Sequence, residues 1–166
     1  MEQFQALYLS PLGNLILVSN RQHLIEIQIT DDKHCEVSQT IPTPLQKTIN
    51  WLDDYFSGKK PSLDSLPLHL QGTAFQKEVW SYLPQIPYGQ TVTYGEIAAN
   101  IAKKRKIKRM SAQAVGQAVG ANPIPIIIPC HRVVGANGTP GGYACGLDRK
   151  LWLLRFESKN KTKSCG

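Results

Sequence analysis

Three short apolar segments near the start of the chain predict β-strands. Each is rich in β-branched and apolar side chains, and turn-forming residues separate them. Strands this short that are joined by tight turns pair antiparallel, so the pattern predicts a small β-meander. The expected strands are residues 4–9, 14–19 and 24–30.

A helix and a connector follow the predicted meander. Thr43 suits the N-cap, Pro44 suits the first helical position, and Gly58 ends a segment with one apolar face. Residues 59–72 are punctuated by proline and glycine, which is typical of a link between domains. We therefore expect an N-terminal domain with its connector over residues 1–72.

The second half of the chain has a helical pattern up to residue 120. Thr73 and Ser111 suit N-caps of two helices, and Thr93 begins a capping box that Glu96 completes. The helix expected after Ser111 carries mostly small side chains and follows a basic linker. Two helices in this order resemble a helix-turn-helix, although an Ala/Gly helix packed inside the protein has the same pattern.

A proline-bounded isoleucine segment follows and predicts a short, buried, extended stretch that positions Cys130 and His131. After a glycine-rich loop we expect a last helix over about 148–156. The polar, basic tail over 158–166 is expected to be disordered. The C-terminal domain is thus expected over 73–157, and the whole chain in the mixed α/β (α+β) class.

Charge is distributed unevenly along the chain. Residues 1–71 carry 5 basic and 8 acidic side chains, whereas residues 72–166 carry 14 basic and 4 acidic ones. A basic half of this kind favours a polyanionic partner such as nucleic acid, or an anionic membrane face. A solvated surface that only maintains solubility would give the same imbalance.

Other sequence features exclude several protein classes. No apolar run is long enough for a transmembrane helix, and the first residues lack the pattern of a signal peptide. The four cysteines are scattered without CxxC spacing, which argues against a disulfide framework or a cysteine-rich zinc site. We therefore expect a cytoplasmic protein with no membrane association.

Cys130 stands directly before His131 and between rigid prolines, which favours a nucleophile. A thiol becomes reactive as the thiolate, and His131 can take its proton directly or through one water. Neighbours on an extended segment point to opposite faces, so the pair need not be in direct contact and a water bridge between them is a reasonable expectation. A buried structural cysteine beside an unrelated histidine is the alternative explanation of the pair alone.

The segment from Asn122 to Val133 closely resembles the active-site segment of the alkylguanine-DNA alkyltransferases, the methylated-DNA–protein-cysteine methyltransferases. The resemblance is strong over residues 73–157 and looser in the N-terminal meander, through Ser10-Pro11-Leu12-Gly13. Further matching pieces occur in the same order: Phe75 to Trp80, Ile86-Pro87-Tyr88-Gly89, Tyr94-Gly95-Glu96-Ile97-Ala98, Ala114-Val115-Gly116 and Tyr143 to Lys150.

The resemblance implies DNA repair by direct, irreversible transfer of an alkyl group from the exocyclic oxygen of guanine to Cys130, once per molecule and without a cofactor. It assigns His131 as base through water, Glu157 as the group that orients the imidazole, and Tyr94 as proton donor. Asn122 would hold the turn before the active-site segment. Taken alone, Tyr94, Glu157 and Asn122 each have ordinary structural explanations.

The resemblance also implies a ribonuclease-H-like N-terminal domain and a monomer that binds double-stranded DNA carrying alkylated guanine. The damaged base must rotate out of the duplex, and the helix after Ser111 would lie in the minor groove. The residues expected to bind substrate or DNA are Arg109, Ser111, Gln113, Ala114, Val133, Tyr143, Ala144, Cys145, Gly146 and Lys150.

The chain departs from the family pattern in three places. Gln113 stands where the family usually has an arginine that fills the gap left by the rotated base, so either Gln113 or Arg109 would do this. Cys145 replaces the first glycine of a pocket glycine pair, which adds a second thiol near the site. The N-terminal ligands that bind zinc in some members are missing, so we expect no metal.

Two rival functions use the same residues. A cysteine hydrolase built on Cys130, His131 and Glu157 would turn over many times on an ester or amide. A non-catalytic binder of alkylated DNA would recruit other repair enzymes, but this class is expected to lack the acceptor cysteine.

Overall fold

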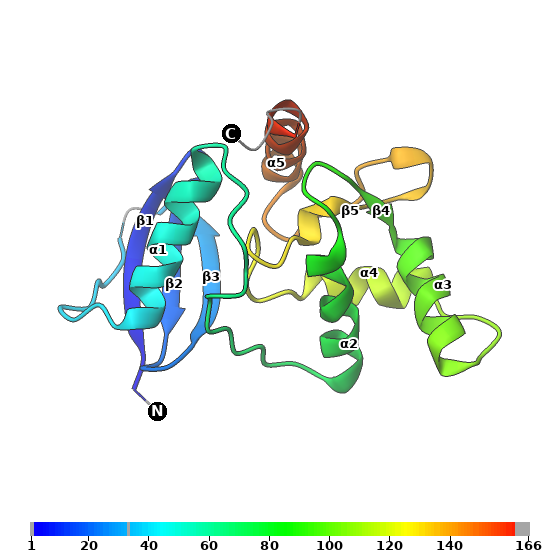
Figure 1. Cartoon of the computed structure of the whole chain (residues 1–166), viewed down its shortest axis with the longest axis horizontal. Helices are drawn as coiled ribbons and strands as arrows, with labels where there is room; N and C mark the ends of the chain where they lie inside the picture. The colour runs from blue at the N-terminus through cyan, green and yellow to red at the C-terminus, as the bar shows by residue number, and fades with distance from the viewer. Residues whose placement is uncertain (1, 33, 162–166) are drawn as a thin grey trace. The chain divides into compact units, whose positions relative to one another are not determined.

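The computed structural model describes residues 2–32 and 34–161 and divides into two compact units, Met1–Gln71 and Gly72–Gly166. The first holds a three-stranded sheet and one helix, and the second is mostly helical (Figure 1). The expected α+β class is confirmed. The division between the units falls inside the proline- and glycine-containing connector.

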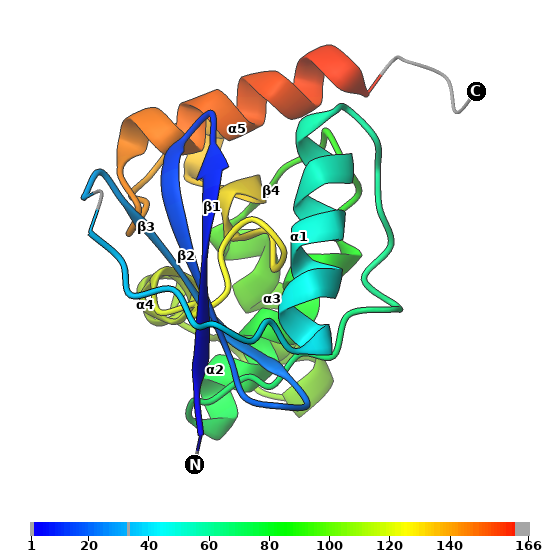
Figure 2. The same ribbon diagram turned by 90° about the vertical axis from the view of Figure 1, so that its left-hand side faces the viewer.

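The first unit is an antiparallel meander with a helix across one face. Its strands are β1 (Phe4–Ser10), β2 (Gly13–Ser19) and β3 (Leu24–Thr30), paired in the order β1-β2-β3. Helix α1 (Thr43–Phe56) contacts all three strands, and Figure 2 shows it beside the sheet. The three strands lie close to where the hydrophobic pattern predicts them, because alternating apolar residues specify which face is buried.

One detail of α1 differs from the expectation. The N-cap is Pro42, and Thr43 already belongs to the first helical turn together with Pro44. The Pro42 backbone is extended, and no side chain caps this end of the helix. Packing fixes α1 instead, since Leu45 and Leu52 are fully buried and the Trp51 and Tyr55 rings stack 5.4 Å apart.

The second unit contains four longer helices, and their N-caps follow the sequence signals. They are α2 (Ala74–Tyr82), α3 (Tyr94–Arg105), α4 (Ala112–Gly120) and α5 (Leu147–Asn160), with a short 3-10 turn η1 (Leu83–Gln85) after α2. Thr73 and Thr93 form capping boxes with Gln76 and Glu96, and Ser111 accepts a hydrogen bond from the Ala114 amide. Short polar side chains therefore set where three of these helices begin.

Trp80 ties α2 to α4. Its indole Nε1 donates to the carbonyl oxygen of Ala118 at 2.7 Å, and the side chain is 1% exposed. Small residues on α4 leave room for this close approach, and Val115 and Val119 complete the buried face of the helix. The inner side of the slim helix is thus part of the core, while Ser111, Gln113 and Gln117 on the other side are exposed.

A two-stranded parallel pairing was not expected from the sequence. Strand β4 (Val92–Thr93) lies beside β5 (Val133–Val134), with Val92 opposite Val133 and Thr93 opposite Val134. Each strand has only two residues, which is too short for a periodicity to show. The pairing has a large effect, because it brings the start of α3 next to the segment that carries Cys130.

The expectation of an extended isoleucine segment is wrong. Residues 124–128 are buried as expected but form turns, and Ile126 adopts a φ of 75°. Cys130 begins a 3-10 turn, η2 (Cys130–Arg132), instead of standing on a strand. Three prolines at alternate or nearby positions remove backbone donors, so the chain folds on itself instead of pairing in a sheet.

The last helix is longer than expected. It begins at Leu147 and continues to Asn160, so residues 158–160 of the expected disordered tail are helical. Residues 162–166 of that tail lie outside the described residues. The loop before the helix includes a short 3-10 turn, η3 (Ala136–Gly138). No helix in the described ranges is both long and apolar enough to cross a membrane.

Candidate active site

A cavity of about 730 Å³ lies in the second unit, and Cys130 is in its wall. The start of α3, one face of α4 and the loop before α5 supply most of its lining. The structure therefore gathers residues from positions 93 to 145 of the chain around one sulfur. The expected site residues that line this cavity are Tyr94, Gln113, Asn122, Cys130, Tyr143, Ala144 and Cys145.

The thiol of Cys130 is nearly buried, with 5% of the residue exposed. Burial raises its pKa to about 11, and the Asn122 side chain and the charge of Lys150 partly oppose this rise. The resting group is therefore the neutral thiol near pH 7. A reaction that needs the thiolate must remove this proton through a neighbouring base.

Asn122 fastens the turn that leads to Cys130. Its Nδ2 donates to the carbonyl oxygen of Ile128 at 2.7 Å, and its Oδ1 accepts from the amide of Ile124 at 3.0 Å. Both groups belong to the buried isoleucine turn, whose backbone would otherwise lack these partners. One side chain thus fixes the turn that leads to the thiol.

His131 is fully buried behind Cys130, and its ring is oriented by Glu157. Its Nε2 lies 2.6 Å from Oε2 of Glu157, whereas the buried Nδ1 makes no hydrogen bond to any described residue. Burial lowers the pKa of His131, so the ring is neutral at physiological pH. A carboxylate accepts only, so Nε2 carries the proton and Nδ1 keeps a free lone pair.

Arg132 and the Gly89 amide hold the Glu157 carboxylate in place. The guanidinium donates from Nε to Oε1 at 2.7 Å and from Nη2 to Oε2 at 3.1 Å, and the Gly89 amide donates to Oε1 at 3.3 Å. Nη1 of Arg132 also donates to the carbonyl of Ile86. Burial alone would raise the pKa of Glu157, but the hydrogen bonds and charges of His131 and Arg132 hold it well below its usual range.

Lys150, expected to bind substrate or DNA, is fully buried and does not line the cavity. Its Nζ donates to the carbonyl oxygens of Val133 at 2.6 Å and Gly142 at 3.2 Å, and to the Tyr94 hydroxyl at 3.4 Å. Burial lowers its pKa to about 8, and the negative charge that Cys130 can carry opposes this shift. Lys150 therefore joins the segment after Cys130 to the start of α3 and supplies positive charge near the Cys130 sulfur.

Tyr94 is the first residue of α3, directly after β4, and its ring borders the cavity. Its hydroxyl donates to the carbonyl of Gly142 at 3.4 Å, and burial raises its pKa, as does the charge of Cys130. A Cβ at Gly141, where φ is +69°, would come within 3.1 Å of the Tyr94 ring and hydroxyl. The glycine therefore lets the loop approach this side chain closely.

The remaining expected DNA-binding residues lie at or near the N-terminus of α4 or away from the cavity. Arg109 and Ser111 are exposed, and Ala114 is half-buried. Val133 is buried, and Gly146 precedes α5 with a φ of +102°; neither of them lines the cavity. The residues that sequence reasoning missed are Arg132 as a partner of Glu157, and Gln117, which lines the cavity one helical turn after Gln113.

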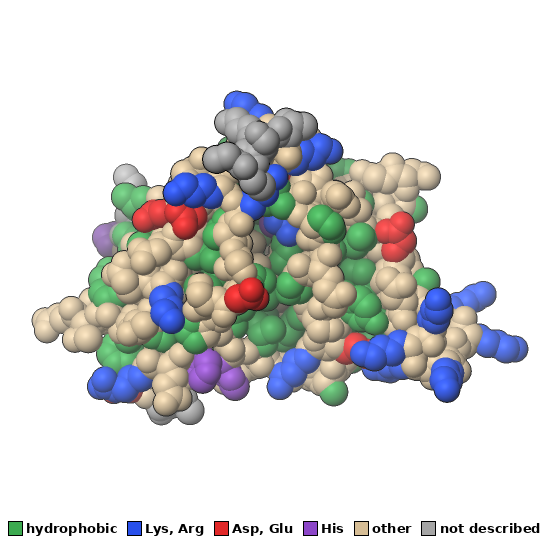
Figure 3. All heavy atoms as spheres, in the orientation of Figure 1, with side chains coloured by type: hydrophobic (Ala, Val, Ile, Leu, Met, Phe, Trp, Pro, Cys, Tyr) green, Lys and Arg blue, Asp and Glu red, His purple; other side chains and the backbone are tan. Residues whose placement is uncertain are grey.

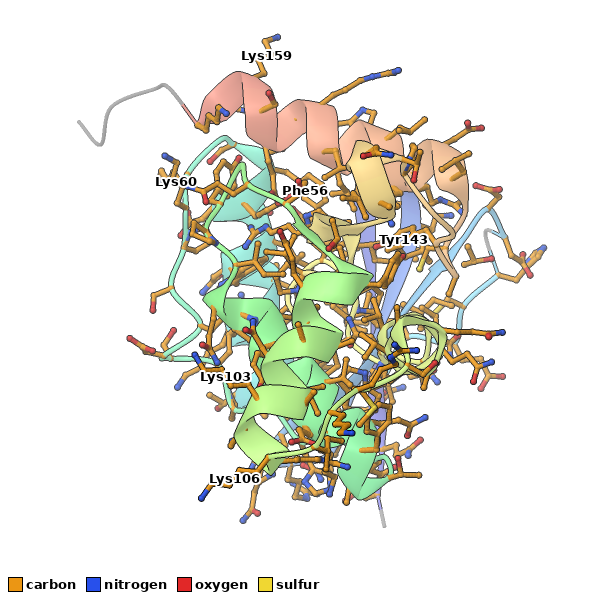
Figure 4. The ribbon with its side chains drawn as sticks, turned by 90° about the vertical axis from the view of Figure 1, so that its right-hand side faces the viewer. Phe56, Lys60, Lys103, Lys106, Tyr143 and Lys159 are labelled. Atoms are coloured by element: carbon orange, nitrogen blue, oxygen red, sulfur yellow. The ribbon has the colours of Figure 1, made fainter. Side chains whose placement is uncertain are left out.

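A basic turn, which we define as residues 103–109, joins the end of α3 to α4. All of its residues are exposed, and Lys106 adopts a left-handed conformation at the helix end. Figure 3 shows Lys and Arg side chains gathered at this end of the unit, and in Figure 4 Lys103 and Lys106 extend away from the ribbon. Arg105 forms an ion pair with Glu78, whereas no described residue pairs with Lys103, Lys104, Lys106, Lys108 or Arg109.

No group of three or more histidine, cysteine, aspartate or glutamate side chains within residues 2–32 and 34–161 is arranged to hold a metal ion.

Two family models match almost the whole chain. Residues 4–70 match the ribonuclease-like domain of 6-O-methylguanine DNA methyltransferase, and residues 74–159 match the DNA-binding domain of the same family. Both matches follow the division into two units seen in the structure.

Individual relatives agree with these models. The chain is 45% identical over 136 residues to a methylated-DNA–protein-cysteine methyltransferase of Salmonella typhimurium, covering 82% of this chain and 75% of that protein. It is 41% identical to one from Methanosarcina acetivorans, with 93% and 97% covered. A crystal structure of the Mycobacterium tuberculosis O6-methylguanine methyltransferase superposes with a TM-score of 0.78 at 37% identity, covering 96% and 94%. A structure of Mycobacterium tuberculosis OGT in complex with DNA gives 0.78 at 38% identity, covering 93% and 92%.

The buried Glu157 should make stability depend on pH in a specific way. Glu157→Gln should cost about 3 kcal/mol near pH 7, because Arg132 and His131 lose a buried charged partner. The stability that the ionised Glu157 carboxylate contributes is fully present above about pH 4.3, the pKa of a glutamate in the unfolded chain. This stability is lost as the pH falls toward the lower pKa that Glu157 has in the native protein. The penalty should therefore shrink below about pH 4.

Urea unfolding of the wild type and the variant at several pH values measures this penalty. Glu78→Gln is the matched control, since Glu78 pairs with the exposed Arg105 and should cost at most about 1 kcal/mol. An equal penalty for Glu157→Gln at pH 7 and pH 3 would show that the native protein does not hold the pKa of this carboxyl below its unfolded value.

Proposed function

The chain belongs to the 6-O-methylguanine DNA methyltransferase family, and we propose that Cys130 is the residue that accepts the alkyl group. Its function is DNA repair by alkyl transfer. The proposed substrate of the protein is a guanine in double-stranded DNA that carries an alkyl group on its exocyclic oxygen. The observation that supports it best is that Cys130 lies in the wall of a cavity. The next residue, His131, is buried, and its Nδ1 has no hydrogen-bond partner among the described residues.

The first step is removal of the thiol proton. The neutral His131 ring can accept it at Nδ1 through a bridging water, and the resulting imidazolium is stabilised by Glu157 at 2.6 Å. Arg132 keeps that carboxylate ionised and aimed, so it acts as a positioning residue. The thiolate forms beside the charge of Lys150 and the side chain of Asn122, both of which favour it.

The second step is an in-line displacement. The thiolate attacks the alkyl carbon, a sulfur–carbon bond forms, and the bond from that carbon to the guanine oxygen breaks. The electron pair of the broken bond stays with the guanine base, which leaves more easily if it is protonated. Tyr94 borders the cavity, and its hydroxyl can donate that proton to the base. The Lys150 ammonium, 3.4 Å from the Tyr94 oxygen, then stabilises the phenolate.

DNA approaches the face on which α4 begins. A base inside a duplex cannot reach Cys130, so the damaged nucleotide must rotate into the cavity. The exposed small and polar side chains of α4 allow close contact with the minor groove, and Gln113 or Arg109 fills the gap left by the base. The unpaired cations of the basic turn contact phosphates and position the duplex.

The product is a thioether, which offers no acyl carbonyl for water to attack, so the thiol is not restored and each molecule acts once. Every group in the proposed mechanism comes from the second unit of one chain, which is consistent with a monomer. The acceptor must stay reduced until it reacts, so the proposal includes a cytoplasmic location.

The stoichiometry of alkyl transfer tests this function. Incubation with excess DNA containing O6-methylguanine should add one methyl group to each protein molecule, on Cys130, and then stop. Intact-mass and peptide mass spectrometry measure the adduct, while chromatography of the hydrolysed DNA measures the remaining damage. Cys130→Ala should remove the adduct, whereas Cys35→Ser, in the first unit, should leave it unchanged.

Two results would contradict the proposal. Continued loss of damaged base beyond one equivalent would indicate a multiple-turnover enzyme such as a hydrolase. Tight binding of damaged DNA by the wild type without any mass increase would indicate a binder that recruits other enzymes.

The basic turn should control the salt dependence of DNA binding. Replacing Lys103, Lys104 and Lys106 by glutamine should weaken binding and reduce the slope of log affinity against log salt by about 0.9 for each phosphate that the variant no longer neutralises. Titrations of a fluorescent duplex with Cys130→Ala protein at several salt concentrations measure this slope. Lys59→Gln with Lys60→Gln serves as the control, and an unchanged slope in the triple variant would remove the turn from the interface.

A further inference from the structure

Gln117 lines the same cavity as Cys130, and the proposed alkyl transfer gives it no role. The residue is exposed, and its side chain makes no hydrogen bond to any residue within 2–32 or 34–161. A carboxamide carries two donor hydrogens and an oxygen that accepts. Gln117 therefore presents unused hydrogen-bonding groups at the place where the damaged DNA must enter.

Gln117 belongs to a strip of α4 that faces the cavity. The four residues of this strip are spaced as one side of a helix requires, and they are Gln113, Gly116, Gln117 and Gly120. A Cβ at Gly120 would meet no atom within 4 Å, and one at Gly116 would make only ordinary contact with the Tyr94 ring. The protein's own packing does not fill this strip, and its two projecting side chains are both amides.

The opposite side of α4 holds these two amides at a fixed spacing. Val115 and Val119 are buried there, and the carbonyl oxygen of Ala118 accepts the hydrogen bond from the Trp80 indole. α4 packs against both α2 and α3 (Figure 1). Side chains on a packed helix are positioned more precisely than side chains on a loop. Gln113 and Gln117 therefore reach two separate positions along a bound duplex.

The distance between the two glutamines matches neighbouring positions in DNA. Of the two residues considered for the gap left by the rotated base, Gln113 lines the cavity and Arg109 does not. Residues four apart on a helix have Cβ atoms about 5–6 Å apart, whereas successive bases along a strand are about 3.4 Å apart. With Gln113 in the gap, the base pair beside the gap is the first one that Gln117 reaches.

We propose that Gln117 recognises the base pair beside the damaged guanine from the minor groove, and that alkyl transfer is faster when this pair is G·C. Every base pair presents acceptors in the minor groove, but only G·C adds a donor, the exocyclic amine of guanine. The Gln117 amide can donate to an acceptor and accept from this amine. The inference rests on the proposed function, in which α4 enters the minor groove and the damaged base rotates out.

The contact affects the rate because it accompanies the rotation of the base. Unstacking and unpairing the damaged nucleotide costs free energy, and contacts made by the seated helix offset part of this cost. Hydrogen bonds from Gln117 to a G·C pair would add to those contacts. An A·T pair lacks the amine and supports fewer of them.

The test removes the amine of the DNA and the amide of the protein separately. Duplexes carry O6-methylguanine with either a G·C or an inosine·cytosine pair on one flank, and then on the other, because inosine lacks only the minor-groove amine of guanine. The rate of methyl transfer to excess protein is measured in a single turnover for the wild type, Gln117→Ala and Gln117→Met. Methionine retains an unbranched side chain of similar length but has no amide.

The expected result is a difference between ratios of rates. On one flank, the ratio of the G·C rate to the inosine·cytosine rate should be about fivefold larger for the wild type than for either variant, near the lower end of what a bidentate side-chain contact to a base contributes. Inosine also weakens the pair and eases rotation of the damaged base, but this effect is common to all the proteins and cancels in the comparison. Gln90→Ala, at an exposed position outside the cavity lining, is the control and should keep the wild-type ratio.

Two results would overturn the proposal. One is an equal ratio in the wild type and both variants on each flank. The other is a loss of rate in the variants that is the same for every duplex, since this would assign Gln117 to the sugar–phosphate backbone.

Failure of the proposed function gives a different result. Wild-type protein that takes no methyl group from any duplex would refute alkyl acceptance at Cys130. The affinities of the wild type and the variants for the same duplexes would then decide the role of Gln117, and equal affinity ratios would overturn it.

Discussion

The buried carboxylate of Glu157 is the group on which the candidate site depends. It receives His131 on one oxygen, the Arg132 side chain on both oxygens and the Gly89 amide. Moving a charge out of water costs several kcal/mol, so a buried charge without such partners would become neutral or move to the surface. Removing one partner of a buried ion pair costs about 3–5 kcal/mol of stability. With them, Glu157 stays ionised and fixes the proton of His131 on Nε2. The other ring nitrogen, Nδ1, makes no hydrogen bond to a described residue and keeps a lone pair that can accept a proton.

The backbone brings the remaining groups to the same place. The β4–β5 pairing holds the start of α3 against the segment after Cys130, and the capping box of Thr93 sets where Tyr94 begins the helix. Lys150 then joins both sides, since it donates to the Val133 carbonyl and to the Tyr94 hydroxyl. The oxygen atoms that accept these hydrogen bonds are neutral and do not cancel the ammonium charge. Lys150 can therefore stabilise negative charge on the Cys130 sulfur or on the Tyr94 oxygen.

Much of the fold could be predicted from the sequence because it follows local signals. Alternation of apolar residues indicated the three strands, and Thr73, Thr93 and Ser111 indicated the helix starts. The errors concern features that local patterns do not encode. The two-residue strands are too short for periodicity, the isoleucine segment turns because its prolines cannot pair in a sheet, and α5 continues through polar residues to Asn160.

The candidate site was predicted largely from a resemblance, and the structure adds its physical connections. Arg132 and Lys150 show the difference most clearly. Their partners, Glu157 and the Tyr94 hydroxyl, are 25 and 56 positions away in sequence, so spacing alone could not reveal them.

The most direct test of the role of Glu157 is the 15N chemical shift of the two ring nitrogens of His131 near pH 7. The shifts should be those of a neutral ring with its proton on Nε2, and a proton on Nδ1 or a doubly protonated ring would contradict the role of Glu157 given above.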